Sequence, residues 1–132
     1  MKEKKKSVEK GYYEMTVKDS FDAAHYLINY PGKCVNLHGH TWDVEVVVGG
    51  EKLNEIGLLY DFRSLKKILK ELLNKFDHKY LNEIAPFDKE SPTAENLARY
   101  LFKKLSESVP SEIKLVKVTV WESLEAKVTY SE

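Results

Sequence analysis

Apolar and polar residues alternate in two stretches of the first half of the chain, and each stretch predicts a β-strand. The first runs from Met15 to His25 and the second from Thr41 to Val48, after which Gly49-Gly50 ends the pattern. Side chains alternate between the two faces of a strand, so every second residue shares a face. In the second stretch the apolar face carries Trp42, Val44, Val46 and Val48. Both strands are therefore expected to bury one face and expose the other.

Two later stretches repeat apolar residues at helical spacing. The first follows Asp61, a good N-cap residue, and its apolar stripe is Leu65, Ile68, Leu69, Leu72, Leu73 and Phe76. The second follows Ser91 and Thr93, either of which can cap a helix, while Pro92 suits a first-turn position. Its stripe is Leu97, Tyr100, Leu101 and Leu105. Each helix has one apolar stripe, so each is expected to cover one side of a sheet.

Two further strands are expected near the end of the chain. Their alternating residues are Val116, Val118 and Val120, and then Ala126, Val128 and Tyr130. The element order is therefore ββααββ, which favours an α+β fold with one four-stranded antiparallel sheet and both helices on a single face. The helices leave the other face and the sheet edges uncovered. We expect sheets of several subunits to join and close these edges, so the chain is expected to be a homo-oligomer.

Composition narrows the class of protein. The length of 132 residues predicts a single domain over residues 11–132, preceded by a basic tail, residues 1–10, that is expected to be disordered. The 21 basic residues balance the 21 acidic ones, which argues against a nucleic-acid partner. One cysteine cannot form an internal disulfide, and the sequence has no secretory signal and no membrane span. A cytoplasmic protein without a membrane partner is expected.

Histidine is the residue type that points to chemistry, because the chain has only four: His25, His38, His40 and His78. His38 and His40 are one residue apart on an expected strand, so their side chains share a face and can bind one metal ion. His25 ends the preceding strand and could complete a three-histidine site with an open fourth position, as in catalytic zinc sites. Copper, iron and nickel also accept imidazole ligands. Taken alone, the His-x-His pair could equally be polar residues on a half-exposed strand.

Six motifs carry a resemblance that covers nearly the whole chain after the tail. They are Phe21-Asp-Ala-Ala-His25, Cys34-x-x-x-His38-Gly-His40, Asp61-Phe62, Asp77-His78-x-Tyr-Leu-Asn82, Pro92-Thr-Ala-Glu-Asn96 and Trp121-Glu122-Ser123. In this order the set resembles the 6-pyruvoyl-tetrahydropterin synthase family. The resemblance implies the tunnelling fold (T-fold), in which trimers close a barrel of strands and two trimers stack into a hexamer.

The spacing around Cys34 resembles one branch of that family. Three residues separate Cys34 from His38, as in 6-carboxytetrahydropterin synthases, which serve 7-deazaguanine and queuosine synthesis. The pyruvoyl-forming branch usually has a longer gap, and a third branch has glutamate in place of the cysteine. The resemblance therefore implies a zinc-dependent lyase that converts 7,8-dihydroneopterin triphosphate to 6-carboxy-5,6,7,8-tetrahydropterin, with loss of acetaldehyde and triphosphate.

Three alternatives to this function stay open. The nearest is a 6-pyruvoyl-tetrahydropterin synthase, which eliminates triphosphate. A hydrolase that uses metal-bound hydroxide is the second, and it predicts activity that survives the change Cys34→Ala. A non-catalytic zinc- or pterin-binding module is the third, and it predicts no turnover with metal and ligand both bound.

The resemblance also implies roles for individual residues. The zinc (Zn2+) ligands would be His25, His38 and His40. Cys34 would accept a proton, and the field of the zinc could supply the cationic neighbour that a thiol needs to ionise at neutral pH. Asp77 and His78 would shuttle protons as an oriented pair. Glu122 would accept hydrogen bonds from the amino and ring N–H groups of the pterin.

Each of these residues also has a purely structural interpretation. Cys34 could be a small buried apolar residue, the pair Asp77-His78 could be polar residues at a helix end, and Glu122 could be a surface acid. Thr93 and Glu95 are further candidates for substrate binding, although helix capping and first-turn charge also explain them.

The sequence does not identify the group that binds the triphosphate. Basic residues near the motifs are few, and the candidates are Lys33, Arg63 and Lys79. A neighbouring subunit could also supply this group, because the active site could be shared between subunits.

Overall fold

The structure, a computed structural model, describes residues 11–28 and 38–132. Residues 1–10 and 29–37 lie outside the described part, and with them lie the predicted tail, Lys33 and Cys34. The described elements are β1 (Tyr13–His25), β2 (His38–Gly50), α1 (Phe62–Leu73), β3 (Lys79–Tyr80), the 3-10 helix η3 (Leu81–Glu83), α2 (Ala94–Ser108), β4 (Lys114–Ser123) and β5 (Ala126–Tyr130). The order and type of the main elements confirm the α+β prediction.

The strands form one sheet in the order β3-β1-β2-β4-β5. The pairs β1–β2, β2–β4 and β4–β5 are antiparallel, as expected. The expected number of four strands is wrong, because the two-residue strand β3 adds a fifth that runs parallel to β1. So short a strand leaves no alternating pattern in the sequence, and its pairing is fixed by the turn that follows α1.

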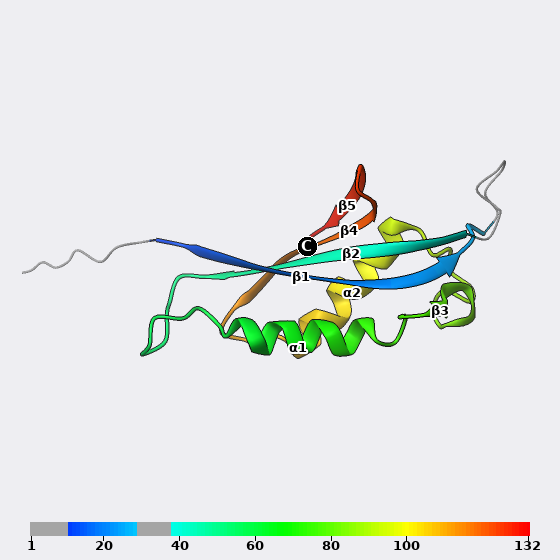
Figure 1. The fold of residues 1–132 in the computed structure, drawn as a ribbon. Helices are drawn as coiled ribbons and strands as arrows, with labels where there is room; N and C mark the ends of the chain where they lie inside the picture. The colour runs from blue at the N-terminus through cyan, green and yellow to red at the C-terminus, as the bar shows by residue number, and fades with distance from the viewer. Residues whose placement is uncertain (1–10, 29–37) are drawn as a thin grey trace, which may run out of the picture.

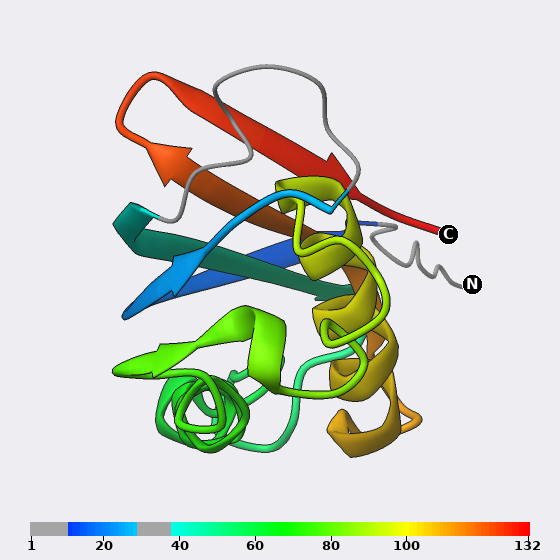
Figure 2. The ribbon, with the colours of Figure 1, turned by 90° about the vertical axis from the view of Figure 1, so that its right-hand side faces the viewer.

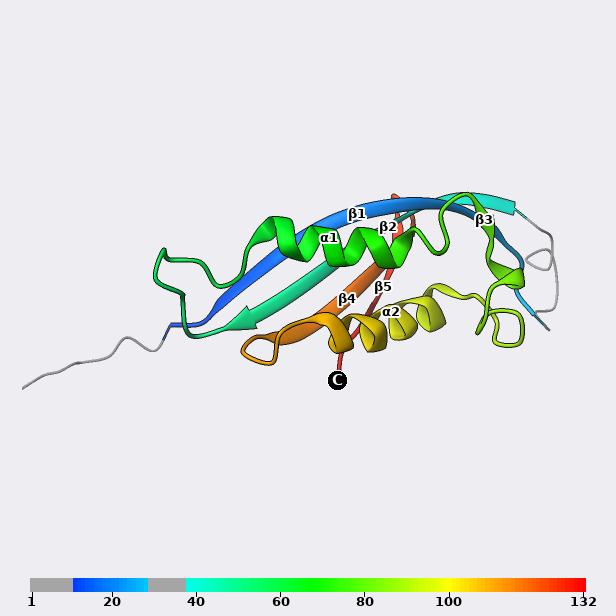
Figure 3. The ribbon, with the colours of Figure 1, turned by 90° about the horizontal axis from the view of Figure 1, so that it is seen from below.

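Both helices lie on one side of the sheet, as the single apolar stripes predicted (Figures 1 and 3). Helix α1 packs on β1, and α2 packs on β4 and β5. Figure 2 shows α1 end-on and α2 running to its right, at a steep angle to α1. The apolar face of the central strand β2 belongs to the core: its residues Trp42, Val44, Val46 and Val48 are fully buried. None of the helices in the described residues is long and apolar enough to cross a membrane.

The helix ends show why each helix begins where it does. Asp61 is the N-cap of α1 and accepts a hydrogen bond from the N–H of Arg63 at 2.8 Å, as predicted. Thr93 is the N-cap of α2 and accepts from the N–H of Asn96 at 3.0 Å. Pro92 precedes this cap, so its predicted first-turn position is wrong by two residues.

The predicted end of the first helix also needs a correction. Helix α1 ends at Leu73, so Phe76 lies in the turn that follows it. Phe76 is nevertheless fully buried, and its ring contacts those of Phe21, Phe87 and Tyr100. The turn brings Phe76 back over the core, which is why its apolar character continued the stripe.

Candidate functional site

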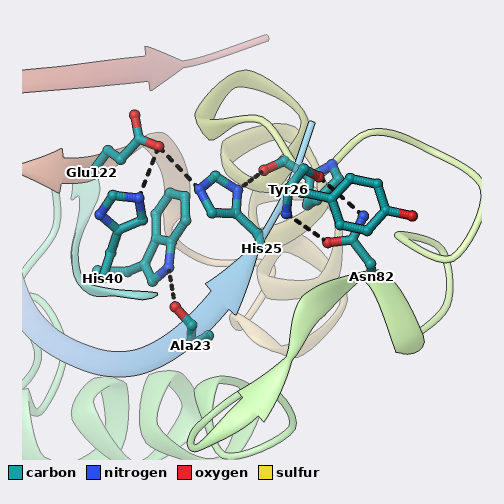
Figure 4. Close-up of polar contacts among 8 residues, drawn as sticks. Ala23, His25, Tyr26, His40, Asn82 and Glu122 are labelled. Carbon is teal, nitrogen blue, oxygen red and sulfur yellow. Dashed lines mark hydrogen bonds and ion pairs between the residues drawn. The ribbon is translucent and has the colours of Figure 1, made fainter. Parts of the chain in front are cut away.

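Three side chains from three strands converge at one end of the sheet. His25 ends β1, His40 lies near the start of β2, and Glu122 lies near the end of β4. The Oε2 atom of Glu122 is 3.2 Å from Nε2 of His25 and 3.4 Å from Nε2 of His40 (Figure 4). These three atoms all lie within 4.8 Å of one another, close enough to hold one metal ion. We call these residues the His25–His40–Glu122 cluster.

His25 is held in one orientation by its surroundings. Its side chain is 1% exposed, and its ring packs edge-on against Trp42 with the centroids 4.9 Å apart. Its Nδ1 atom lies 2.9 Å from the carbonyl oxygen of Pro92. A carbonyl only accepts, so Nδ1 carries the proton and Nε2 is directed at Glu122. This is the arrangement by which metal-binding histidines are usually oriented.

The distances in the cluster suit a metal better than an ion pair. Ligand atoms that lie about 2.0–2.1 Å from a tetrahedral zinc are about 3.3–3.4 Å apart. A hydrogen bond from an imidazolium to a carboxylate is shorter, about 2.7–2.9 Å. The separations of 3.2 and 3.4 Å are therefore those expected between ligands of one ion. Imidazole and carboxylate are both zinc ligands, so this donor set fits the metal implied by the sequence.

The structure brings two of the three predicted zinc ligands together. His25 and His40 meet in the cluster. His38 is the first residue of β2 and pairs with His25 in the β1–β2 register, but its side chain lies outside the described part of the structure. The same holds for the whole of Cys34. The three-histidine site and the role of Cys34 thus stay predictions.

The three predicted substrate-binding residues line one pocket. Thr93, Glu95 and Glu122 surround a volume of about 340 Å³ between the N-terminal end of α2 and the β4–β5 hairpin. Leu27 and Val128 supply apolar surface, and Lys127 also lines the pocket, with its Nζ atom 4.7 Å from the centroid of the Trp121 ring. A carboxylate, a hydroxyl and apolar walls suit a flat heteroaromatic ring with N–H donors.

The predicted catalytic pair lies at the edge of the sheet where β3 joins β1. The carboxylate of Asp77 is 3.1 Å from Nδ1 of His78, and its other oxygen accepts the N–H of Asp22 at 2.9 Å. The N–H of His78 donates to the carbonyl of Asp22 at 2.6 Å. The hydrogen bond from the Asp22 main chain is the main cause that holds the pKa of Asp77 below its usual value, and the contact with His78 adds to it. The pair is not simply the end of α1, because that helix stops at Leu73.

His78 adopts an unusual main-chain conformation. Its φ of 59° lies in the left-handed region, which is uncommon for a residue other than glycine. Two hydrogen bonds between Asp22 and the Asp77-His78 pair hold this conformation. As a result the imidazole is 78% exposed and accessible to a ligand.

Two hollows are each lined by one residue of the His25–His40–Glu122 cluster. His40 and His78 line a wider depression of about 620 Å³, and Glu122 lines the smaller pocket. His40 and Glu122 are themselves in contact at 3.4 Å. The wider depression is also lined by Asp22, Ala24, Gly39 and Thr41, which alternate with the buried Ala23, His25 and Trp42 and therefore face the opposite side of the sheet.

Sequence reasoning assigned no role to several groups that shape this site. The Pro92 carbonyl orients His25, and the Asn82 side chain bonds to both the N–H and the carbonyl of Tyr26, the next residue along from His25. Lys127 lines the small pocket. Pro92 and Asn82 belong to the sequence motifs, and this membership was the one sign in the sequence that they could matter to the site. Lys127 gave no signal, because only the hairpin brings it to the pocket.

The candidates for triphosphate binding lie apart from one another. Arg63 is at the start of α1, where its 92% exposed side chain lies 3.5 Å from Asp61. Lys79 belongs to β3 and lines the wider depression. Of the three predicted candidates, Lys79 is the one that the described structure places beside the site residues, while Lys33 lies outside the described part.

Comparison with known proteins decides the family. A family profile described as 6-pyruvoyl tetrahydropterin synthase matches residues 14–132. The chain belongs to this family. A 6-carboxy-5,6,7,8-tetrahydropterin synthase from Aquifex aeolicus is 35% identical, over 76% of this chain and 76% of that protein. A dihydroneopterin monophosphate aldolase from Pyrococcus furiosus is 37% identical, over 80% of this chain and 86% of that protein.

A solved structure extends the likeness to the fold. The 6-pyruvoyl tetrahydropterin synthase of Caenorhabditis elegans superimposes with a TM-score of 0.82 at 34% identity, and the match covers 96% of this chain and 99% of that one. The T-fold prediction is therefore confirmed for the single subunit, while its assembly into trimers or hexamers stays a prediction. The family match and the named relatives also confirm the predicted enzyme class, a lyase of the tetrahydropterin synthase type.

Proposed function

We propose that this chain converts 7,8-dihydroneopterin triphosphate and one water molecule to 6-carboxy-5,6,7,8-tetrahydropterin, acetaldehyde and triphosphate. The observation that supports it most is the position of Glu122, which faces the imidazoles of His25 and His40 and also lines the pocket with Thr93 and Glu95. A pterin ring in the small pocket would place its side chain over the cluster. The spacing of Cys34 from His38 and the Aquifex relative favour the carboxy-forming branch.

The site residues would have separate roles in this reaction, in metal binding and in proton transfer. His25, His38 and His40 would hold zinc, which supplies Lewis-acid polarisation of the oxygens on the substrate side chain. Cys34 would take a proton from the side-chain carbon. Asp77 and His78 would move a second proton, because the carboxylate 3.1 Å from Nδ1 fixes the tautomer and leaves Nε2 to exchange protons with the substrate.

Recognition of the pterin would rest on the pocket at the start of α2. Glu122 would accept two parallel N–H donors from the ring, a match of two donors to one carboxylate. The hydroxyl of Thr93 accepts from Asn96, and its own hydrogen can still donate to a ring acceptor. Glu95 lines the same pocket and could accept a further N–H. Lys127 and Lys79 are the cations we assign to the triphosphate.

We further propose that the active form is a homo-oligomer, a trimer or a stacked pair of trimers. The Asp77-His78 pair lies beside β3 at one edge of the sheet, whereas Glu122 and Lys127 lie on β4 and β5 at the opposite edge. Joining sheets edge to edge would bring the pair of one subunit toward the pocket of the next, and it would pair the exposed strands. The predicted cytoplasmic location stays a prediction.

Mass spectrometry of the products tests the reaction. Zinc-loaded protein with 7,8-dihydroneopterin triphosphate should yield 6-carboxytetrahydropterin and acetaldehyde in equal amounts. A 6-pyruvoyl product would instead establish the pyruvoyl-forming alternative. Formation of no product from the triphosphate would contradict both.

The Pyrococcus relative gives a specific reason to consider a second activity. Its name states an aldolase that acts on dihydroneopterin monophosphate, and its 37% identity is similar to that of the carboxy-forming relative. The same assay with dihydroneopterin monophosphate distinguishes the two. Cleavage of the side chain with the phosphate still attached to the released fragment would favour the aldolase.

A further inference from the structure

The Glu122 side chain faces both the two imidazoles of the cluster and the pocket at the start of α2. Its Oε2 atom faces the imidazoles of His25 and His40, and the same side chain lines the pocket with Thr93 and Glu95. We propose that Glu122 is a ligand of the metal in the substrate-free protein, and that a pterin bound in the pocket draws its carboxylate away from the metal. This inference rests on the proposed pterin site, and it adds a role for Glu122 that the pterin site alone does not require.

The ligand role follows from the distances. Both imidazole nitrogens are separated from one carboxylate oxygen by 3.2 and 3.4 Å, the spacing of neighbouring ligands around a tetrahedral ion. A carboxylate that only neutralised an imidazolium would approach it more closely. The carboxylate is also placed symmetrically between two rings from different strands. It therefore acts as a third ligand beside two imidazoles, rather than as the partner of one imidazole in an ion pair.

The ability to leave the metal follows from the difference in burial. His25 is 1% exposed and is fixed by the Pro92 carbonyl, whereas the Glu122 side chain is 38% exposed. Glu122 lies one residue from the end of β4, next to the turn that leads into β5. A rotation of its side chain toward the pocket therefore displaces little of the core. Of the three cluster residues, Glu122 has the most exposed side chain.

Such a movement would couple recognition to reactivity. A three-histidine site has one open position for the substrate. A fourth ligand from Glu122 closes that position at rest, and the ring donors of a pterin compete for the same carboxylate. The position then opens only when a pterin is bound, which would exclude other oxygen ligands from the metal until the substrate arrives.

The first experiment measures zinc affinity by competition with a chromophoric chelator for wild type, Glu122→Gln and the control Glu125→Gln. Glu125 lies in the exposed β4–β5 turn. We expect Glu122→Gln to weaken zinc binding at least tenfold, and Glu125→Gln to leave it within twofold of wild type. An unchanged zinc affinity in Glu122→Gln would overturn the ligand role, whatever reaction the enzyme catalyses.

A second experiment needs no variant, so it stands even if Glu122→Gln fails to fold. Wild-type protein loaded with Co²⁺ is titrated with unsubstituted pterin, which lacks the side chain that could itself bind the metal. Binding is followed by pterin fluorescence, and metal coordination by the visible Co²⁺ bands. We expect the bands to change in step with binding. Pterin that binds without changing the bands would refute the exchange, and pterin that does not bind would refute the proposed pterin site.

Discussion

The main chain of Asp22 holds Asp77 in place: its N–H donates to Oδ1 of Asp77 at 2.9 Å. The carbonyl of the same residue accepts the N–H of His78 at 2.6 Å. One residue of β1 thus fixes both members of the proposed proton-transfer pair. The pair therefore has a defined geometry although the imidazole is exposed.

This relationship predicts an acid-sensitive contribution to stability. The folded-state pKa of Asp77 lies below its usual value of 3.8, chiefly because its carboxylate accepts the Asp22 N–H. Stability from a depressed carboxyl pKa is present above the unfolded value and is lost as the pH falls through the folded value. Asp77→Asn should lower the urea midpoint at pH 7, and the difference from wild type should shrink below pH 3.8.

A matched control for Asp77→Asn is Asp88→Asn, at an exposed turn residue. Its urea midpoint should differ little from that of wild type at either pH. A difference between Asp77→Asn and wild type that stays constant as the pH falls would contradict the proposed origin of the effect.

The change Cys34→Ala tests the predicted proton acceptor. Turnover should fall by at least about a hundredfold, the usual contribution of a positioned acid or base, while zinc stays bound. The measurement is the steady-state rate together with the zinc content of the purified variant. Retained activity would exclude Cys34 as the proton acceptor and favour a mechanism that uses metal-bound hydroxide.

Mixing two inactive variants tests whether neighbouring subunits share a site. If Cys34 and the Asp77-His78 pair of one site come from different subunits, random co-assembly of Cys34→Ala with Asp77→Asn restores an intact set in about a quarter of the sites. Activity should appear after the two variants are unfolded and refolded together. If the mixture stays as inactive as its parts although mixed oligomers form, each site lies within one chain.

Periodicity predicted the large elements of this fold because their residues pack with one face inward. The β2 alternation and both helical stripes are of this kind, and Trp42 is fully buried as that pattern required. The features that periodicity did not predict lack a repeating pattern of apolar residues. Phe76 continued the stripe of α1 but is buried from a turn, and β3 is too short to alternate.

The candidate site was predictable only where its residue types are rare. Four histidines in the chain drew attention to His25 and His40, and the structure places both in one cluster. The contact of Glu122 with these rings could not be predicted, because it depends on how β4 pairs with β2. For the same reason Lys127 was not recognised as a pocket residue.

Asn82 should stabilise the loop beyond His25. Its amide side chain donates to the Tyr26 carbonyl at 3.0 Å and accepts the Tyr26 N–H at 2.9 Å. Asn82→Ala removes two partly buried hydrogen bonds, which should lower the unfolding free energy by about 1–3 kcal/mol. Asn82→Asp keeps the acceptor and should lose less. Zinc affinity should fall more in the alanine variant, because Tyr26 directly follows a cluster residue.

Urea unfolding and zinc competition of the same two Asn82 variants check this order. Equal losses in both would show that the acceptor contributes nothing. An unchanged zinc affinity in Asn82→Ala would show that the loop anchor does not position His25.

Thr93 carries two functions that substitutions can separate. As N-cap of α2 it accepts the N–H of Asn96, and it also lines the proposed pterin pocket. Thr93→Ala should lower the unfolding free energy by about 1 kcal/mol through loss of the cap. Thr93→Ser keeps a hydroxyl and should retain both the stability and the KM of the wild type. Thr93→Asp keeps an acceptor for the cap but has no hydroxyl hydrogen to donate, so it should be stable while its KM for the pterin substrate rises. A Thr93→Asp variant with wild-type KM would assign Thr93 to capping alone.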